Sequence, residues 1–158
     1  MNSLAITIRP FLIPPVLVVF FLVIDVVLVS PPHISLARFT SAAAWPGWVV
    51  ITFALLLIIA AVLQMLLQRT TVDPLHLDKT QTLITSGLFR LSRNPIYLGF
   101  ALLLLGVALV LKSLIAGVLV ALFMLTMTWL HIRIEEQYLS QKFGSTWAQY
   151  TRRTRRWL

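Results

Sequence analysis

Two short segments of the sequence carry charged side chains next to aromatic ones. Residues 90–97, RLSRNPIY, place two arginines before an Asn-Pro pair, and residues 131–136, HIRIEE, contain the only two glutamates of the chain. Acidic and basic groups together could hold a zwitterionic or multiply charged small molecule, and aromatic faces suit a cation. The sequence therefore predicts a site for a charged ligand, provided that the fold brings the two segments together.

The Asn94-Pro95 pair gives the first segment an additional property. Pro95 has no backbone N–H to donate, and a residue that precedes proline is disfavoured in α geometry. Peptide groups around residues 91–97 are therefore partly free to meet a ligand. The simpler alternative is that Glu135 and Glu136 only solvate a helix end, where an exposed ion pair contributes at most about 1 kcal/mol.

The composition decides which elements must position these residues. Of the 158 residues, 59% are hydrophobic and 11% are charged, and the mean hydropathy is +0.91. A soluble domain would carry about 25% charged residues. We therefore predict an all-α integral membrane protein with about four transmembrane helices of ~20 residues each and a cytosolic C-terminal helix. Residues 1–158 are expected to form a single domain.

Four apolar runs are the candidate spans. They cover residues 11–29, 45–67, 96–111 and 114–130, and a polar, helical segment follows from His131. Asp25 lies inside the first run, where a carboxylate is costly and usually faces protein or water. Gly99, Gly106 and Gly117 would let the third and fourth helices approach each other closely.

Lys and Arg are distributed unevenly between alternate connections. With the N-terminus inside, 11 of the 13 Lys and Arg residues fall on cytoplasmic segments, as the positive-inside rule requires. A multi-pass protein with both termini in the cytoplasm follows, in the inner or plasma membrane if the organism is bacterial. The last two runs are joined only by Lys112 and Ser113, so they form a hairpin. Both flanks of this hairpin, RLSRNP and HIRIEE, then lie at the cytoplasmic face.

Several other kinds of site are excluded or weakly supported. The chain has no cysteine, which excludes disulfides, thiolate zinc sites and cysteine nucleophiles. His33 is expected on the other membrane side and His76 is isolated, so a metal site has little support. Ser86 and Ser92 lack a His–Asp partner for a hydrolase triad, and no Walker or dinucleotide glycine motif is present.

The net charge of +8 has a simple interpretation in a membrane protein. Basic residues on the cytoplasmic side anchor a protein to anionic lipid, so no nucleic-acid partner is expected. The tail RRTRRWL, residues 152–158, is expected to lie on the lipid surface as a solvated charge run. Membrane lipids and a lipid-like small-molecule substrate are thus the expected partners.

A longer pattern connects the two charged segments. LITSGLFRLSRNPIYLG, residues 83–99, is followed by the hairpin and then by E-E-x-x-L-x-x-x-F-G-x-x-W-x-x-Y from Glu135 to Tyr150. This pattern resembles the isoprenylcysteine carboxyl methyltransferase family, which belongs to a larger group that includes phospholipid N-methyltransferases. The resemblance covers roughly residues 81–150, and the two motifs in this order are specific together.

The resemblance implies S-adenosylmethionine as the cofactor, bound at the cytosolic membrane face. The residues that match the family's cofactor-binding positions are Gln81, Thr82, Leu83, Ile84, Phe89, Asn94, Pro95, Ile96, Tyr97, Glu135 and Glu136. The Glu pair would hold the cofactor's ammonium or ribose hydroxyls, and Tyr97 or Phe89 would face its sulfonium or adenine. Asn94 replaces the family's His, and an Asn side chain can still hydrogen-bond.

Three further residues are the candidate catalytic residues. Arg93, His131 and Arg133 would position an acidic group of the cofactor or of the substrate. His131 aligns with a substrate-contacting Arg of eukaryotic members, and this departure weakens the substrate assignment. It also lies four residues before Glu135, so both residues are expected on one helix face.

The expected function is S-adenosylmethionine-dependent methyl transfer to a lipid-like or isoprenoid acceptor, with a carboxylate as the first choice. Methyl transfer is an in-line displacement that depends on alignment more than on an acid–base pair. The alternatives are methylation of a phospholipid amine, a sterol-reductase-like enzyme that uses NADPH, and a non-catalytic membrane scaffold. The reductase would need more spans and a clamp for the 2′-phosphate.

Overall fold

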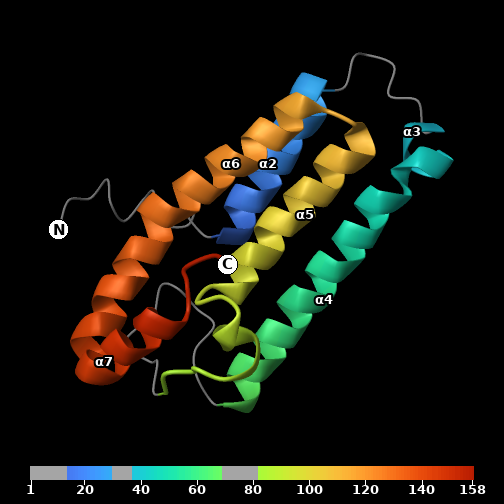
Figure 1. Cartoon of the computed structure of the whole chain (residues 1–158). Coiled ribbons are helices and arrows are strands. Elements are labelled where there is room, and N and C mark those ends of the chain that lie inside the picture. The colour runs from blue at the N-terminus through green and yellow to red at the C-terminus, as the bar shows by residue number, and fades with distance from the viewer. Residues whose placement is uncertain (1–13, 30–36, 69–81) are drawn as a thin grey trace. The chain divides into compact units, whose positions relative to one another are not determined.

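The computed structural model describes residues 14–29, 37–68 and 82–158, and all regular structure in these ranges is helical (Figure 1). The elements are α2 (Pro14–Val29), α3 (Ala37–Thr40), the 3-10 helix η2 (Ala42–Ala44), α4 (Trp45–Leu67), the 3-10 helix η4 (Gly87–Arg90), α5 (Pro95–Leu111), α6 (Leu114–Met127), the π-helix η5 (Thr128–Ile132) and α7 (Arg133–Arg153). The predicted all-α class is therefore confirmed for the described residues.

Among the described residues, two continuous helical stretches are long and apolar enough to cross a membrane. They are Ala42–Leu67, with 26 residues, and Leu114–Arg153, with 40 residues. Shorter apolar helices cover Pro14–Leu28 and Pro95–Leu111. The helix predicted over 45–67 coincides with α4, and large apolar side chains along α4 are exposed, as lipid contact requires. The helix predicted over 114–130 continues without a break into polar α7.

The turn between α5 and α6 lies where the sequence predicts it. Lys112 adopts a positive φ of 52°, which ends α5. The Ser113 hydroxyl then accepts the backbone N–H of Ala116 at 3.2 Å and caps the first turn of α6. The predicted two-residue connection of the hairpin is confirmed.

The described residues form two compact units. The first contains residues 14–29, 37–52 and 101–127. In this unit α2 packs against α6, and the Phe21 ring meets the Phe123 ring edge-on at a centroid distance of 5.5 Å. The buried side chains of α6 are Ala116, Val120, Phe123 and Met127. This apolar contact holds α2 against α6.

Glycines of α5 face α4, which differs from the contact with α6 that the sequence analysis expected. A Cβ atom on Gly106 would lie 2.6 Å from Ile51 Cγ1 and 3.0 Å from the carbonyl oxygen of Gly47. In the second unit, a Cβ atom on Gly99 would likewise collide with Ile58 of α4. A Cβ atom on Gly117 of α6, in contrast, would meet no atom within 4 Å. The close helix approach therefore involves α4 and α5.

Gly106→Ala is expected to destabilise the protein by about 1–3 kcal/mol, because the added methyl group would overpack the contact with Ile51 and Gly47. Gly117→Ala is the matched control, since its methyl group enters open space and alanine favours a helix. Thermal unfolding of both variants in detergent, followed by circular dichroism, measures the difference. Equal Tm values for the two variants would contradict the close approach of α4 and α5.

Asp25 lies on the face of α2 that packs against α6, one helical turn beyond Phe21. It is 0% exposed, and neither carboxylate oxygen has a hydrogen-bond partner among the described residues. An unsatisfied buried polar group costs roughly 1–3 kcal/mol. We therefore expect Asp25→Leu to raise the Tm in detergent, and Asp25→Asn, which keeps a polar group there, to raise it less. A lower Tm in Asp25→Leu would mean that the carboxylate contributes to folding.

The second unit contains residues 53–68, 82–100 and 128–158 among those described, and a small apolar core holds it together. Its members are Ile84, Phe89, Trp147 and Tyr150, with Met65, Leu83, Leu139 and Phe143 packed around them. The Tyr150 hydroxyl donates to the carbonyl of Phe89 at 2.7 Å, and burial raises the pKa of Tyr150 to about 12. The Gln64 side chain donates to the Ser86 carbonyl at 2.7 Å and accepts the Leu88 N–H at 3.1 Å. The loop before α5 is thus fixed to both α4 and α7.

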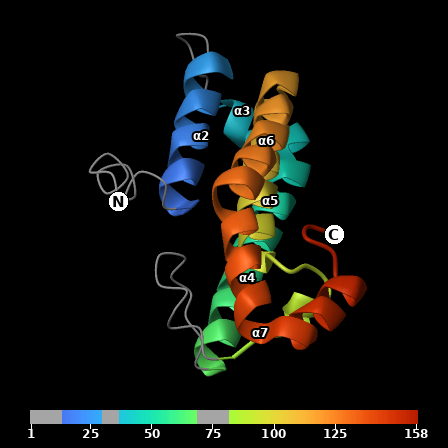
Figure 2. The same ribbon diagram turned by 90° about the vertical axis from the view of Figure 1, so that its left-hand side faces the viewer.

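A glycine bends α7 within the F-G-x-x-W motif. Gly144 has φ 49° and ψ −118°, which interrupts the helical geometry. Figure 2 shows α7 changing direction before the C-terminal segment. Trp147 and Tyr150 follow this bend and enter the apolar core. The bend therefore returns the end of the chain to the loop before α5.

Candidate functional site

The loop before α5 ends in the geometry that its Asn-Pro pair predicts. The backbone N–H of Asn94 donates to Ser92 Oγ at 3.1 Å, and the Asn94 carbonyl accepts the N–H of Leu98 at 2.9 Å. Pro95 is the first residue of α5, where its missing N–H removes no helical hydrogen bond. The chain therefore enters α5 in one defined geometry, with Arg93 before the break and Tyr97 after it.

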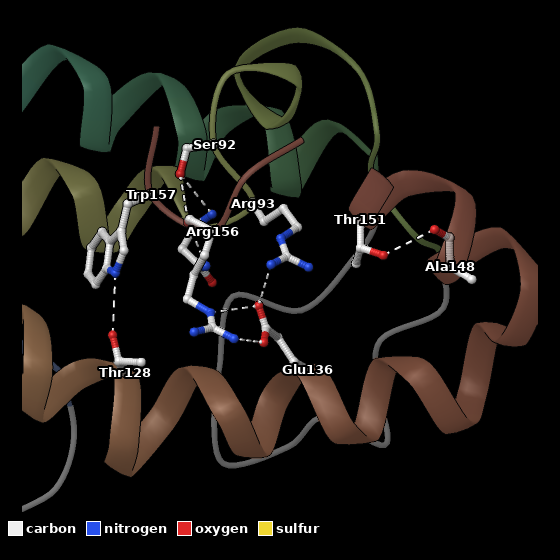
Figure 3. Close-up of polar contacts among 9 residues, drawn as sticks. Ser92, Arg93, Thr128, Glu136, Ala148, Thr151, Arg156 and Trp157 are labelled. Atoms are coloured by element: carbon white, nitrogen blue, oxygen red, sulfur yellow. Dashed lines mark hydrogen bonds and ion pairs between the residues drawn. The ribbon is translucent and has the colours of Figure 1, made fainter. Parts of the chain in front are cut away.

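Glu136 is held between two arginines (Figure 3). Arg93 Nη2 lies 3.0 Å from Glu136 Oε1, and Arg156 contacts both carboxylate oxygens, with Nε at 3.1 Å and Nη2 at 2.5 Å. The side chains of Arg93 and Glu136 are only 13% and 16% exposed. The Arg93 guanidinium also lies 5.5 Å from the centre of the Trp147 ring. Glu136 is thus neutralised by cations from two distant parts of the chain.

Glu135 has a different environment. Its Oε1 accepts a hydrogen bond from the Tyr97 hydroxyl. The apolar run of its helix ends at Leu130, so Glu135 lies in the polar part that follows this run. Burial raises the pKa of Glu135 to about 7, the Tyr97 hydrogen bond opposes this shift, and the Glu136 charge adds to it. Glu135 is therefore a carboxylate that a bound cation would favour in its charged form.

The π-helix η5 connects α6 to α7 directly before the two glutamates. A π-turn holds one more residue than an α-turn and changes the direction of the side chains that follow, and such turns are frequent at functional sites. His131 lies in this segment, is 8% exposed, and has its ring centroid 6.4 Å from that of Tyr97. Tyr97 is thus the side chain that contacts both His131 and Glu135.

The structure brings together six of the candidate residues of the sequence analysis. These are Arg93, Asn94, Tyr97, His131, Glu135 and Glu136. Arg133 is separate from them, because it is exposed and its guanidinium lies 3.5 Å from the centre of the exposed Trp129 ring. Arg133 therefore lies on the exposed surface with Trp129, and its cation–π contact is with this ring and not with either glutamate.

Most of the remaining candidates lie in the apolar core of the second unit or at the start of α5. Ile84 and Phe89 are buried in the apolar core and Leu83 packs against it, while Thr82 is exposed. Pro95 is buried and Ile96 partly buried at the start of α5. Gln81 lies outside the described residues. Leu83 and Ile84, which precede η4, therefore belong to the apolar core on which the loop before α5 packs.

Arg156 was not among the residues predicted at the site, because the whole tail, residues 152–158, was expected to be a solvated charge run. This is wrong for Arg156, which pairs with Glu136 and whose carbonyl accepts hydrogen bonds from Ser92 Oγ at 3.2 Å and Asn94 Nδ2 at 3.0 Å. The other three arginines of the tail are exposed. The hydrogen bond to Glu136 raises the pKa of Arg156. Four arginines occur in RRTRRWL, and no feature of the pattern separates Arg156 from the others.

The two glutamates therefore offer different chemistry. Glu136 has both oxygens occupied by guanidinium groups, whereas the hydrogen bond that Glu135 accepts comes from a neutral phenol. A buried carboxylate without a cation in contact favours a cationic ligand or a proton. Among the described residues, the chemistry of Glu135 could therefore suit a cationic or hydroxyl-bearing small molecule, and the aromatic rings of Tyr97 and His131 lie beside it.

Comparison with known proteins assigns the chain to a family. The model of the phospholipid methyltransferase family matches residues 42–146, which include the loop before α5, both glutamates and the Gly144 bend. Neither the curated proteins nor the solved structures contain a significant match. Because the matched region spans more than half of the chain, the protein belongs to the phospholipid methyltransferase family, a family of membrane methyltransferases.

Proposed function

We propose that the protein transfers a methyl group from S-adenosylmethionine to the polar group of a lipid-like acceptor at the cytoplasmic face of the membrane. Glu135 carries the proposal: it lies within the family match, contacts Tyr97, and is not one of the groups that the arginines neutralise. The proposed topology has four spans, both termini in the cytoplasm, and α7 on the cytosolic side, as the distribution of Lys and Arg indicates.

The residues around Glu135 fit the chemistry of this cofactor. S-adenosylmethionine has an ammonium group, ribose hydroxyls and a carboxylate, and a carboxylate such as Glu135 binds the first two. Arg93 Nε is buried without a hydrogen-bond partner among the described residues, so it is a donor that suits an acidic group. The cofactor supplies an activated methyl group on a sulfonium, and Tyr97 offers an aromatic face for such a cation.

The chain's own residues prepare the site before any ligand binds. The Tyr97 hydroxyl fixes the orientation of the Glu135 carboxylate. Arg93 and Arg156 cancel the charge of Glu136, so that the two adjacent carboxylates do not act as one strongly anionic patch. Partial burial removes water from Glu135, which strengthens its interaction with a cation. Such preorganisation is what an alignment-dependent displacement requires.

Two acceptor classes are compatible with the site. The family match supports a phospholipid amine. The ion pairs of Arg93 and Arg156 with Glu136 agree with this choice, because guanidinium groups that already bind a carboxylate are less suited to hold a carboxylate acceptor. The resemblance to isoprenylcysteine carboxyl methyltransferases supports a carboxylate, and the buried His131 would be a partner for it. A methyl-transfer assay with phosphatidylethanolamine vesicles and, separately, with isoprenoid acids distinguishes the two classes.

Calorimetric titration of the detergent-purified protein with S-adenosylhomocysteine tests the proposed cofactor. We expect saturable binding that Glu135→Ala removes and that Gln137→Ala, an exposed neighbour on α7, leaves unchanged. NADPH is the comparison ligand for the reductase alternative. Absence of binding in a folded sample would favour a non-catalytic scaffold, and binding of NADPH alone would replace the methyltransferase proposal.

A further inference from the structure

The C-terminal residues Thr154–Trp157, called the strap below, lie against the loop before α5. Figure 3 shows Arg156 of this segment beside Ser92 and Arg93 of the loop. They follow α7 and lie beyond residues 42–146, which the family match covers. No part of the function proposed above assigns a role to them. Each of the four residues nevertheless makes a polar contact with another segment of the second unit.

Backbone groups of the strap meet the loop at three successive residues. The N–H of Arg93 donates to the carbonyl of Arg155 at 3.0 Å, and the carbonyl of Arg156 accepts from both Ser92 and Asn94. These bonds involve the peptide groups and polar side chains next to the Asn94-Pro95 break. The strap thus satisfies hydrogen-bonding groups that a bound ligand or water would otherwise have to meet.

Side chains fix both ends of the strap. Thr154 Oγ1 donates to the carbonyl of Arg90 at 3.4 Å, and Trp157 Nε1 donates to Thr128 Oγ1, in the π-helix, at 3.3 Å. Between them, Arg156 reaches Glu136 with two nitrogens. The strap therefore connects the loop before α5 to the segment that carries His131 and the glutamates.

We propose that the strap is part of the ligand site and that Arg156 is a positioning residue, whose ion pair with Glu136 holds the strap across the loop before α5. Together with Arg93, Arg156 occupies both oxygens of Glu136, so a ligand cation at Glu136 would have to displace a guanidinium group. Glu135 is consequently the carboxylate that contacts the ligand, and Glu136 fixes the strap across the loop. This division between the two glutamates rests on the proposed function for the identity of the ligand, but the attachment of the strap does not.

The absence of cysteine from the chain allows a direct test in the full-length protein. A spin label on Arg155→Cys, an exposed strap position, reports strap mobility by electron paramagnetic resonance, and titration with S-adenosylhomocysteine reports the site. The variants are Glu136→Gln, Arg156→Gln, their double variant and Arg156→Lys. Arg152→Gln, an exposed arginine in the last turn of α7, is the matched control for loss of one charge.

We expect Glu136→Gln and Arg156→Gln each to mobilise the label and to weaken ligand binding about tenfold. The double variant should be no worse than either single one, because both remove the same contact. Arg156→Lys should restore most of the affinity, since it keeps the charge, and Arg152→Gln should change neither measurement. If Arg156→Lys regains ligand affinity, the effect of Arg156→Gln comes from the lost charge at Glu136 and not from lost side-chain packing.

Two results would overturn the proposal. An immobile label in Glu136→Gln would mean that the ion pair does not hold the strap. A mobile label with unchanged ligand affinity would mean that the strap is not part of the site. If the label becomes mobile in the variants while the wild-type protein binds no S-adenosylhomocysteine, the proposed function fails and the site role of the strap fails with it, although its attachment to Glu136 stands.

Discussion

Glu135→Gln is expected to reduce the affinity for S-adenosylhomocysteine by about 100-fold or more, because an ammonium–carboxylate contact in a partly buried site is lost. The substitution keeps the size of the side chain and an oxygen that can accept the Tyr97 hydrogen bond, so the fold should be preserved. Calorimetric titration measures the change, with Gln137→Ala as the control on the same helix. Retention of wild-type affinity would remove Glu135 from the binding site.

The pH dependence of binding gives a second measurement on the same residue. Burial raises the pKa of Glu135 to about 7, so a cation should bind best above this pH and lose about tenfold in affinity for each unit below it. Glu135→Gln should abolish this dependence. The Tyr97 hydrogen bond lowers the pKa of Glu135, and Tyr97→Phe should therefore move the midpoint to higher pH. A midpoint that does not move would mean that this hydrogen bond does not act on the carboxylate.

The stability of the unliganded protein should change in the opposite direction. The folded-state pKa of Glu135 lies above the ordinary value of 4.5, so its stabilising contribution is complete below pH 4.5 and is lost as the pH rises through about 7. The Tm of the wild-type protein should therefore fall across this range relative to that of Glu135→Gln. Addition of the cationic ligand should reduce the difference, because it favours the charged carboxylate.

The sequence predicted the convergence of the two charged segments because a hairpin is a local constraint. With only Lys112 and Ser113 between two apolar helices, the segment before the first helix and the segment after the second must meet. The contacts Arg93–Glu136 and Tyr97–Glu135 follow from this geometry. The bounds of α4 were predictable because they depend on another local feature, the continuous apolar run of residues 45–67.

Contacts that depend on where the chain turns after the hairpin were not predictable. Arg156 lies 20 residues from Glu136, and any of the four tail arginines has the side chain needed for the ion pair. Only the direction of the chain after Gly144 decides among them. Arg133 was expected at the site because it lies in the charged segment HIRIEE, but η5 precedes it and its side chain lies on the exposed Trp129 ring. The orientation of Gly99 and Gly106 toward α4 likewise depends on a packing choice that a small residue alone does not specify.

Gly144 has a backbone conformation that other residues rarely adopt. Its φ of 49° and ψ of −118° correspond to the first central position of a type II′ turn, where glycine is strongly preferred. A Cβ atom there would meet no atom within 4 Å, so a substitution tests the backbone conformation alone. Asparagine, which tolerates the left-handed helical region near ψ of about +50°, does not suit this ψ.

Gly144→Ala is therefore expected to destabilise the protein by about 1–3 kcal/mol and to release the strap, since every strap contact depends on the direction of the chain after the bend. Gly117→Ala is the matched control: its Cβ atom also meets open space, but its backbone is helical. Thermal unfolding and the mobility of a spin label at Arg155→Cys measure the two effects. Gly144→Asn should behave like Gly144→Ala. If asparagine instead restored the Tm, the bend would be an ordinary left-handed turn, and the attachment of the strap would not depend on glycine.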